Sequence, residues 1–534
     1  MKLRSNSLHF EIVKGTTKHS GYIRNSYRED GKVKHQTISK INGVSLEQLQ
    51  NMKAAFDGNT IKLDDIKITG GREYGASSML FSLAKKIGLD NLVYSRNEPW
   101  VRNVLAMIIG RITYQGSKLS LSQCGDYSAL WEICGVENVD VNRNCYDALD
   151  ALFARQNSIQ KKLAKKHLDN GSVILYDITS SYLEGEFEGS ALAEFGYNRD
   201  KKRGKKQIVI ALVCTKAGCP VAVEVFRGNT TDCTTVLAKI TEIKDTFGIS
   251  KFTFVGDRGM LTQKHLDAVN GENYSGVKTI TALTHSAIKK LCEHENVQLS
   301  MFDEDAITEV ILPEEPNVRY ALKLNPVRRK DEFNQRIALI EKTEVELSEK
   351  AIPKRKTDDS TLAARAAKIF NKYKTEKYFN WEIVDTKIVF SRNENVRAEE
   401  EIYDGFYVIR SDVSADDMNI SQVVEAYRSL INVEQAFRNM KTVQLEMRPI
   451  FHKTDDRIKA HVFLCTLSYY LLWHMNKALK TLYASNSRYT TSHVLEIMKS
   501  LQIFNLNVSG VSSNTIAEPT DIQKHILDLL IGDM

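Results

Sequence analysis

The sequence lacks the cysteine patterns that mark zinc-binding modules. Its 8 cysteines are scattered over 534 residues, and no two of them form a Cys-x-x-Cys pair. Cys214 and Cys219 are close in sequence, but no pair of histidines follows them at the spacing of a zinc finger. We therefore expect no zinc site and interpret the cysteines as buried, reduced thiols.

Long hydrophobic runs are absent as well. Residues 1–7 do not have the apolar segment of a secretory signal, and the most apolar stretch, residues 462–473, is shorter than the roughly 20 residues that span a bilayer. There is no repeat or low-complexity tract, and the net charge of +6 favours nucleic acid only weakly. We expect a globular, cytoplasmic protein of about two to four domains, without a membrane partner.

The first part of the chain is predicted to hold a β-hairpin region and then a helical region. Residues 8–13, 21–28 and 33–39 are typical of strands, with an Asp-Gly turn at Asp30, and a helix over residues 45–56 is predicted to start at a Ser45 cap. We assign residues 1–70 to the hairpin region and 71–169 to helices, which we expect over residues 77–87, 100–112 and 146–168. The last helix ends in a basic cluster that is either a solvated helix end or a DNA contact: Lys161, Lys162, Lys165, Lys166 and His167.

Residues 170–295 change to an alternating α/β pattern. Strands are predicted over residues 173–178, 207–215, 220–227, 251–255 and 277–283, and helices over 234–247, 261–269 and 287–293. The predicted order is three strands, a helix, a strand, a helix, a strand and a helix. This is the order of a ribonuclease-H-like core, in which helices flank a mixed sheet. The predicted fold class is therefore α/β.

A break in this order predicts an insertion over residues 296–415. Residues 305–325 and 381–411 are typical of strands, and residues 327–377 of long charged helices. The core pattern resumes over residues 416–480 with a helix from 420 to about 442 and an apolar helix over 456–479. We assign residues 481–534 to a C-terminal tail, whose sequence gives little indication of its structure.

Three acidic residues stand where metal ligands are expected. Asp177 and Asp257 each follow an apolar run, and Glu434 lies in the predicted helix that begins at residue 420. Phosphoryl transfer by two metals needs hard oxygen ligands around ions about 4 Å apart, and Mg²⁺ keeps several waters, so few protein ligands are required. Each acid alone is equally typical of a turn, a cap or a helix surface. Together they predict a site for two Mg²⁺ ions, with Mn²⁺ as a substitute and Asp177 as the bridging ligand.

A polar stripe surrounds Glu434 in the sequence. Tyr427, Glu434 and Lys441 are seven residues apart, and seven helical steps return a side chain to within about 20° of its start. Arg438 lies four residues beyond Glu434, and Arg428 follows Tyr427. These cations and the phenol are candidates for DNA phosphate contacts, although Glu434 and Arg438 are also spaced for an intrahelical ion pair.

A basic loop is predicted before the strand at 207–215. It holds one acid among six basic residues: Arg199, Lys201, Lys202, Arg203, Lys205 and Lys206. A solvated loop explains such a run, but its local and unbalanced charge favours contact with the DNA backbone.

The motifs resemble those of the Asp-Asp-Glu (DDE) transposases of bacterial insertion sequences, in particular the insertion-sequence-four superfamily. The resemblance rests on residues 176–180, 228–232 and 255–260, the last of which contains Arg258 as a DNA-binding candidate, and on the Tyr427, Glu434 and Lys441 stripe. It implies that Asp177, Asp257 and Glu434 are the catalytic acids. It also implies an insertion rich in β-structure before the catalytic glutamate.

The resemblance implies cut-and-paste transposition as the function. A homodimer would pair the terminal inverted repeats, which residues 1–168 are expected to bind, and would join the excised element to target DNA. The family has an arginine four residues before the glutamate, where this chain has Leu430, so Arg428 or Arg438 is expected to supply that charge. A tryptophan of the insertion holds a flipped base in relatives, and Trp381 is the candidate here, with packing as the alternative.

Two further functions fit the same acids and basic loop. One is a ribonuclease-H-like nuclease that only hydrolyses DNA. The other is a DNA-binding derivative without catalysis, which three intact acids disfavour.

Overall fold

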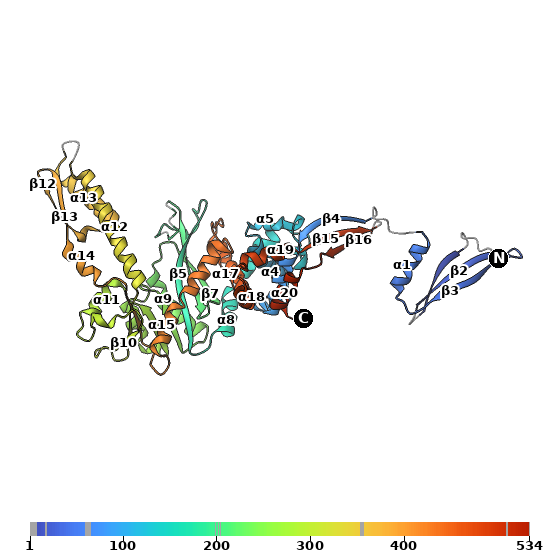
Figure 1. Cartoon of the computed structure of the whole chain (residues 1–534), viewed down its shortest axis with the longest axis horizontal. Helices are drawn as coiled ribbons and strands as arrows, with labels where there is room; N and C mark the ends of the chain where they lie inside the picture. The colour runs from blue at the N-terminus through green and yellow to red at the C-terminus, as the bar shows by residue number, and fades with distance from the viewer. Residues whose placement is uncertain are drawn as a thin grey trace. The chain divides into compact units, whose positions relative to one another are not determined.

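The structure is a computed structural model that describes residues 8–15, 19–58, 66–197, 199–200, 202, 204–352, 357–508 and 511–532. Residues 1–7, Lys201 and Arg203 therefore lie outside the described residues. The chain divides into two compact units (Figure 1). One contains Met1–Gly75, Asp126–Ala129 and Met498–Thr520, and the other contains Ala76–Gly125, Leu130–Ile497 and Asp521–Met534.

The N-terminal hairpin region forms an antiparallel sheet in the order β1 (Leu8–Lys14), β2 (His19–Glu29) and β3 (Lys32–Ile41). The helix α1 (Leu46–Phe56) follows. Its cap is the predicted Ser45, whose Oγ accepts a hydrogen bond from the Gln48 amide at 3.1 Å while the Gln48 side chain accepts one from the Ser45 amide at 2.8 Å. The predicted strands, the turn and the cap are confirmed because their signals are local.

A second sheet in this unit was not predicted. Strand β4 (Ile66–Glu73) pairs with β15 (Gln502–Val508), which pairs with β16 (Val511–Ile516), all antiparallel. Residues far apart in the sequence therefore share one sheet. The C-terminal segment also holds helices that the sequence did not predict: α18 (Lys480–Ser485), α19 (Thr491–Lys499) and α20 (Asp521–Ile531).

The larger unit is built on an eight-stranded mixed sheet in the order β10-β11-β14-β9-β8-β5-β6-β7. Its predicted core strands are β5 (Ser172–Tyr182), β6 (Gln207–Thr215), β7 (Pro220–Arg227), β8 (Phe252–Gly256) and β9 (Val277–Ala282). Strand β5 pairs antiparallel with β6 and parallel with β8. The helices that follow these strands are α9 (Val236–Thr241), α10 (Gln263–Val269) and α11 (His285–Cys292). This mixed α/β architecture is consistent with the predicted ribonuclease-H-like core.

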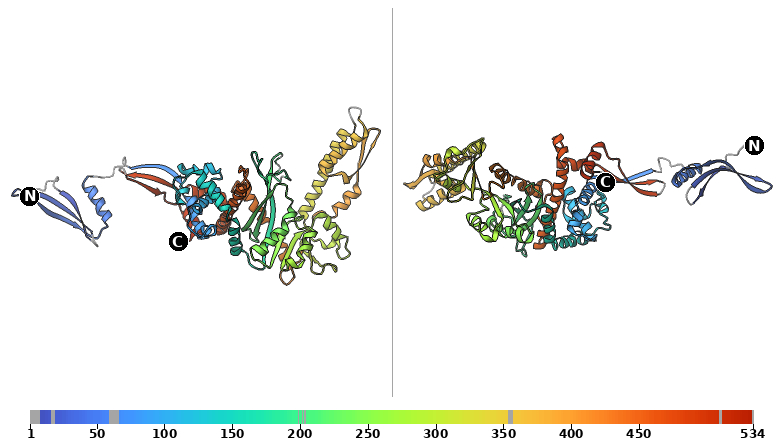
Figure 2. Two further views of the ribbon diagram at one scale, coloured as in Figure 1. Left: turned by 180° about the vertical axis from the view of Figure 1, so that it is seen from behind. Right: turned by 90° about the horizontal axis from the view of Figure 1, so that it is seen from below.

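Three strands of residues 296–415 extend the same sheet. They are β10 (Thr308–Val310), β11 (Arg319–Leu324) and β14 (Phe406–Ser411), and β14 pairs with β9 of the core. Between them, the long helix α12 leads to a small module with its own apolar cluster (Figures 1 and 2). Its elements are α12 (Pro326–Ala351), α13 (Asp359–Tyr373), β12 (Phe379–Val384), β13 (Lys387–Arg392) and α14 (Glu394–Glu401). Helix α14 corrects the prediction of strands alone over residues 381–411.

Helices from residues 75–168 pack in the same unit as the sheet. They are α2 (Gly75–Lys86), α3 (Leu89–Val93), α4 (Pro99–Thr113), α5 (Lys118–Ser122), α6 (Leu130–Ile133), α7 (Asp147–Phe153) and α8 (Gln156–His167). The apolar helix α17 (Asp455–Ala478) contacts α4, α7 and β7 (Figure 1). Among the described residues, none of the helices is both long and apolar enough to cross a bilayer.

The single helix expected over residues 146–168 is wrong. It is divided between α7 and α8, because Arg155 leaves the helical conformation and its guanidinium lies over the rings of Tyr94 and Trp100 at 4.8 and 4.7 Å from their centroids. A tertiary contact thus interrupts a periodic pattern that continues through the sequence. Two of the basic residues near the end of α8 bind backbone carbonyls, Lys162 those of Asn91 and Leu92 and Lys166 that of Ile87.

Candidate active site

Asp177 and Asp257 lie on neighbouring parallel strands. The last residues paired between β5 and β8 are Tyr176 and Gly256, so Asp177 and Asp257 are the next residue of each chain segment. Paired residues of parallel strands point to the same face, and adjacent strands lie about 4.8 Å apart. Strand pairing therefore brings the two carboxylates together.

Asp177 is not at a strand end, contrary to the prediction. Strand β5 continues to Tyr182, and Asp177 pairs with Leu212 of β6. Only the pairing with β8 stops before Asp177. The side chain is half-buried, and its Oδ1 accepts a hydrogen bond from the next backbone amide, that of Ile178, at 2.7 Å.

Glu434 lies on a helix that packs against the same sheet. It lies in α16 (Ile431–Arg438), which packs against β5 and β6. Burial raises the pKa of Asp177 to about 6, and the negative charges of Asp257 and Glu434 contribute to the rise. The negative charges of Asp257 and Glu434 thus both act on Asp177.

This donor set fits hard divalent cations. Carboxylate oxygens are the ligands that Mg²⁺ and Mn²⁺ prefer, and a cation would offset both the burial and the repulsion that raise the Asp177 pKa. Oxygens from all three acids do not lie within 4.8 Å of one another. Acids that share more than one ion need not all lie that close together.

Tyr427 orients Asp257. The tyrosine is buried at the end of α15 (Ile420–Arg428), and its hydroxyl donates a hydrogen bond of 2.9 Å to Asp257 Oδ1. The same oxygen accepts from the Arg258 amide at 2.7 Å. Burial and the Asp257 carboxylate raise the pKa of Tyr427 well above its ordinary value, so the phenol stays protonated and donates. Tyr427, a candidate DNA contact in the sequence analysis, therefore bonds to the Asp257 carboxylate in the structure.

The continuous helix expected from residue 420 to about 442 is wrong. Ser429 ends α15, and its Oγ donates to the carbonyl of Glu425 at 2.9 Å, a bond that bends helices. Helix α16 then begins at Ile431, and Asn439–Val443 forms a π-helical turn. Tyr427 therefore lies in a different helix from Glu434, and Lys441 lies in the turn that follows, so the three residues do not share one continuous helix.

Lys441 is buried rather than exposed to DNA. Its Nζ donates to Thr179 Oγ1 at 2.6 Å and lies 3.3 Å from Asp200 Oδ1, and burial lowers its pKa. The guanidinium of Arg448 forms an ion pair with the same Asp200 oxygen. Asp200 was not predicted as part of the site. It is the one acidic residue in the basic loop, and this exception to the basic pattern is the signal from which the sequence could have predicted it.

The described part of the basic loop is tied to the sheet. Arg199 donates to the Ile178 carbonyl and pairs with Asp232, and Lys205 lies 2.5 Å from Glu184. Lys202 is exposed, with its ammonium 5.9 Å from the centroid of the Tyr182 ring, and Lys206 is half-buried. The predicted contributions of Lys201 and Arg203 lie outside the described residues.

The remaining basic candidates lie around the helix ends. Arg428 and Arg438 are exposed and Arg258 is half-buried. The positive charges of Arg258 and Arg428 both act on the half-buried Tyr407, whose ring lies 5.9 Å from that of Tyr427. These two cations therefore flank the tyrosine that orients Asp257.

Trp381 packs inside the small module of the insertion. Its ring lies 5.4 Å from that of Phe370, and it is half-buried against the cluster that holds Phe370 and Phe379. This is the packing role that the sequence left as the alternative.

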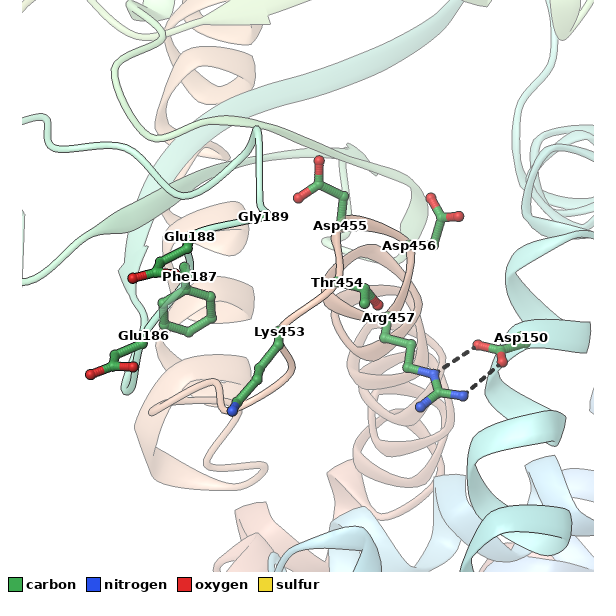
Figure 3. A pocket seen from close by; sticks show the side chains of 10 residues that line it. All are labelled: Asp150, Glu186, Phe187, Glu188, Gly189, Lys453, Thr454, Asp455, Asp456 and Arg457. Carbon is green, nitrogen blue, oxygen red and sulfur yellow. Dashed lines mark hydrogen bonds and ion pairs between the residues drawn. The ribbon is translucent and has the colours of Figure 1, made fainter.

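The structure has one cavity beside Asp177 and another lined by a different set of residues. One of about 440 Å³ lies beside Asp177, and its lining includes Ile178, Arg199, Asn229, Asp232 and Gly259. The other, of about 950 Å³, is lined by more acidic than basic side chains (Figure 3): Asp150, Glu186, Glu188, Asp455, Asp456, Lys453 and Arg457. Arg457 is paired with Asp150 at 3.1 Å. The excess of negative charge makes this second cavity unsuited to DNA phosphates.

The comparisons with known proteins identify the family. No curated protein shows a significant match to the chain. A family model described as the transposase DDE domain matches residues 169–471, which is more than half of the chain and includes all three acids. The chain belongs to the family of transposases with a DDE domain.

Proposed function

We propose that this transposase cuts DNA at terminal inverted repeats and joins the ends to target DNA, as members of the insertion-sequence-four superfamily do. The observation that supports the proposal is the pairing of Tyr176 with Gly256, the residues directly before Asp177 and Asp257, together with the packing of α16, which carries Glu434, against β5. DDE transposases act on nucleic acid with divalent metals, so the family supports this chemistry.

Asp177, Asp257 and Glu434 would hold two Mg²⁺ ions, with Asp177 between them. Bound magnesium would activate the attacking oxygen and stabilise the leaving oxygen of a phosphodiester. Tyr427 and the Arg258 amide hold one oxygen of Asp257 and leave its other oxygen for the ion. Pre-oriented ligands lower the cost of assembling the site on DNA.

The basic side chains divide into two roles in this proposal. Lys202, Arg258, Arg428 and Arg438 are exposed or half-buried around the acids and would contact DNA phosphates. Lys441 is buried and would instead hold the basic loop in place through Asp200. Two copies of the chain would pair the two ends of the element.

The proposal is tested by strand transfer on DNA that carries the inverted repeats flanking the coding region. We expect cleaved and joined products that depend on Mg²⁺ or Mn²⁺. Changing Asp177, Asp257 or Glu434 to Ala should lower both by more than about a thousandfold, with DNA binding retained. The exposed Asp267 of α10 provides the control, and D267A should remain active. Cleaved products without joined products would establish a nuclease, and full activity of an acid variant would remove that residue from the site.

The role of Tyr427 is tested by Tyr427→Phe, which removes one hydrogen bond and keeps the ring. We expect cleavage to fall by about 10- to 100-fold and to need more Mn²⁺ for half-maximal rate, because Asp257 loses a partner that orients it. Binding to DNA, measured by fluorescence anisotropy without metal, should not change. A loss of DNA affinity with an unchanged Mn²⁺ requirement would show that the phenol contacts phosphate instead.

The roles of Lys441 and Arg438 are separated by the salt dependence of DNA binding. An exposed cation that contacts one phosphate contributes about 0.9 to the slope of log affinity against log salt. Arg438→Ala should lower the slope by about one such unit, and Lys441→Met should leave it unchanged while lowering the cleavage rate. An equal loss of slope in both variants would mean that Lys441 leaves its buried position to bind DNA.

A further inference from the structure

Three side chains of the kinds that bind transition metals meet outside the carboxylate site. His167 ends α8, Cys219 lies in the turn between β6 and β7, and His474 lies in α17. One ligand atom from each lies within 4.8 Å of those of the other two. Within the part of the chain that the structure describes, no other trio of His, Cys, Asp or Glu meets this distance.

The turn that carries Cys219 is held in place on several sides. The Cys219 amide donates to Thr215 Oγ1 at 3.2 Å, and its carbonyl accepts from the Thr215 amide at 3.0 Å. Trp473 Nε1 donates to the Ala217 carbonyl at 3.0 Å and thereby joins the turn to α17. The thiol is buried.

One ring nitrogen at this position lacks a partner. His474 Nε2 is buried and has no hydrogen-bond partner among the described residues. The neighbouring His167 Nε2 lies 2.9 Å from the Tyr470 hydroxyl, whose ring packs against His474 at 4.6 Å between centroids. A buried polar atom without a partner is costly, and a metal ion would satisfy it. The Tyr470 contact is of the kind that fixes the orientation of a ligating histidine.

Both imidazoles are in the protonation state that binds metal. Burial lowers the pKa of His167 and of His474 to about 4, with smaller contributions from neighbouring positive charges that include Lys166 and Lys477. Each ring is therefore neutral at pH 7 and has a lone pair available. Lys166 donates to the Ile87 carbonyl at 2.6 Å. Burial raises the pKa of the Cys219 thiol to about 12, so zinc would have to displace its proton on binding.

The donor set selects the class of metal. Two nitrogens and a sulfur suit Zn²⁺ and disfavour Mg²⁺, which prefers oxygen. In a tetrahedral zinc site with bonds of about 2.0–2.3 Å, ligand atoms lie roughly 3.5 Å apart. Small side-chain adjustments would close the observed separations to that value. Both histidines are half-buried, and a water would supply the fourth ligand of a tetrahedral site.

We propose that His167, Cys219 and His474 form a zinc site that joins α8, the β6–β7 turn and α17. The site is separate from the magnesium chemistry proposed above, and its role is structural. The turn also accepts a hydrogen bond from Asn432 of α16, at 2.8 Å on the Lys216 carbonyl. Asn432 lies two residues before Glu434, so zinc would stabilise the region on which the third acid rests.

The test uses the full-length, reduced protein with Zn²⁺ and Co²⁺ as probes. We expect about one zinc per chain after dialysis, and a thiolate-to-cobalt charge-transfer band with the visible bands of tetrahedral cobalt. Cys219→Ser should abolish the charge-transfer band, weaken zinc binding by more than about tenfold and remove the rise in melting temperature that zinc causes. Cys233→Ser changes a half-buried thiol outside the trio and should leave all three properties intact.

Two further variants make each outcome decisive. If Cys219→Ser does not fold, His474→Gln should keep the thiolate band while weakening zinc binding and altering the visible bands. Asp177→Ala tests whether zinc binds at the carboxylate site instead of the trio. Zinc bound at the carboxylates would be lost in this variant and would give no thiolate band. A wild-type protein without a thiolate band, or trio variants that bind zinc as tightly as the wild type, would overturn the proposal.

Discussion

The parallel pairing of β5 with β8 is the constraint on which the candidate active site depends. It ends at Tyr176 and Gly256 and so places two carboxylates side by side. A slip of one residue would turn Asp257 to the opposite face of the sheet. Apolar residues that are fully buried on both strands, among them Leu175 and Val255, fix the register. Hydrophobic burial therefore supports an arrangement that electrostatic repulsion opposes.

Polar contacts across long sequence separations complete the site. The hydrogen bond from Tyr427 to Asp257 joins residues 170 positions apart. Lys441 and Arg448 both reach Asp200 and hold the basic loop beside β5. These contacts connect sequence segments on either side of residues 296–415. That stretch contributes β14 to the sheet next to β9, so it is continuous with the rest of the sheet at that edge.

Local patterns predicted much of the fold, and non-local contacts limited the rest. Strands β6 and β7 begin and end at the predicted residues, because their apolar runs are bounded by turn residues. The second sheet of the smaller unit was missed because β4 and β15 are distant in sequence. The pairing of β5 with β8 agrees with the apolar runs that precede Asp177 and Asp257, whereas the burial of Lys441 depends on Asp200, which no spacing rule links to it. The sequence prediction of no zinc site considered spacing alone, and the His167, Cys219 and His474 trio has no characteristic spacing.

The central claim is that Asp177 bridges two metal ions bound by the three acids. Anomalous diffraction from crystals of the full chain with inverted-repeat DNA and Mn²⁺ tests it most directly. The account predicts two manganese peaks about 4 Å apart, both bonded to Asp177, with one also bonded to Asp257 and the other to Glu434. Manganese peaks that do not touch Asp177, or a DNA-bound site from which Glu434 stays too distant to bind either ion, would contradict it.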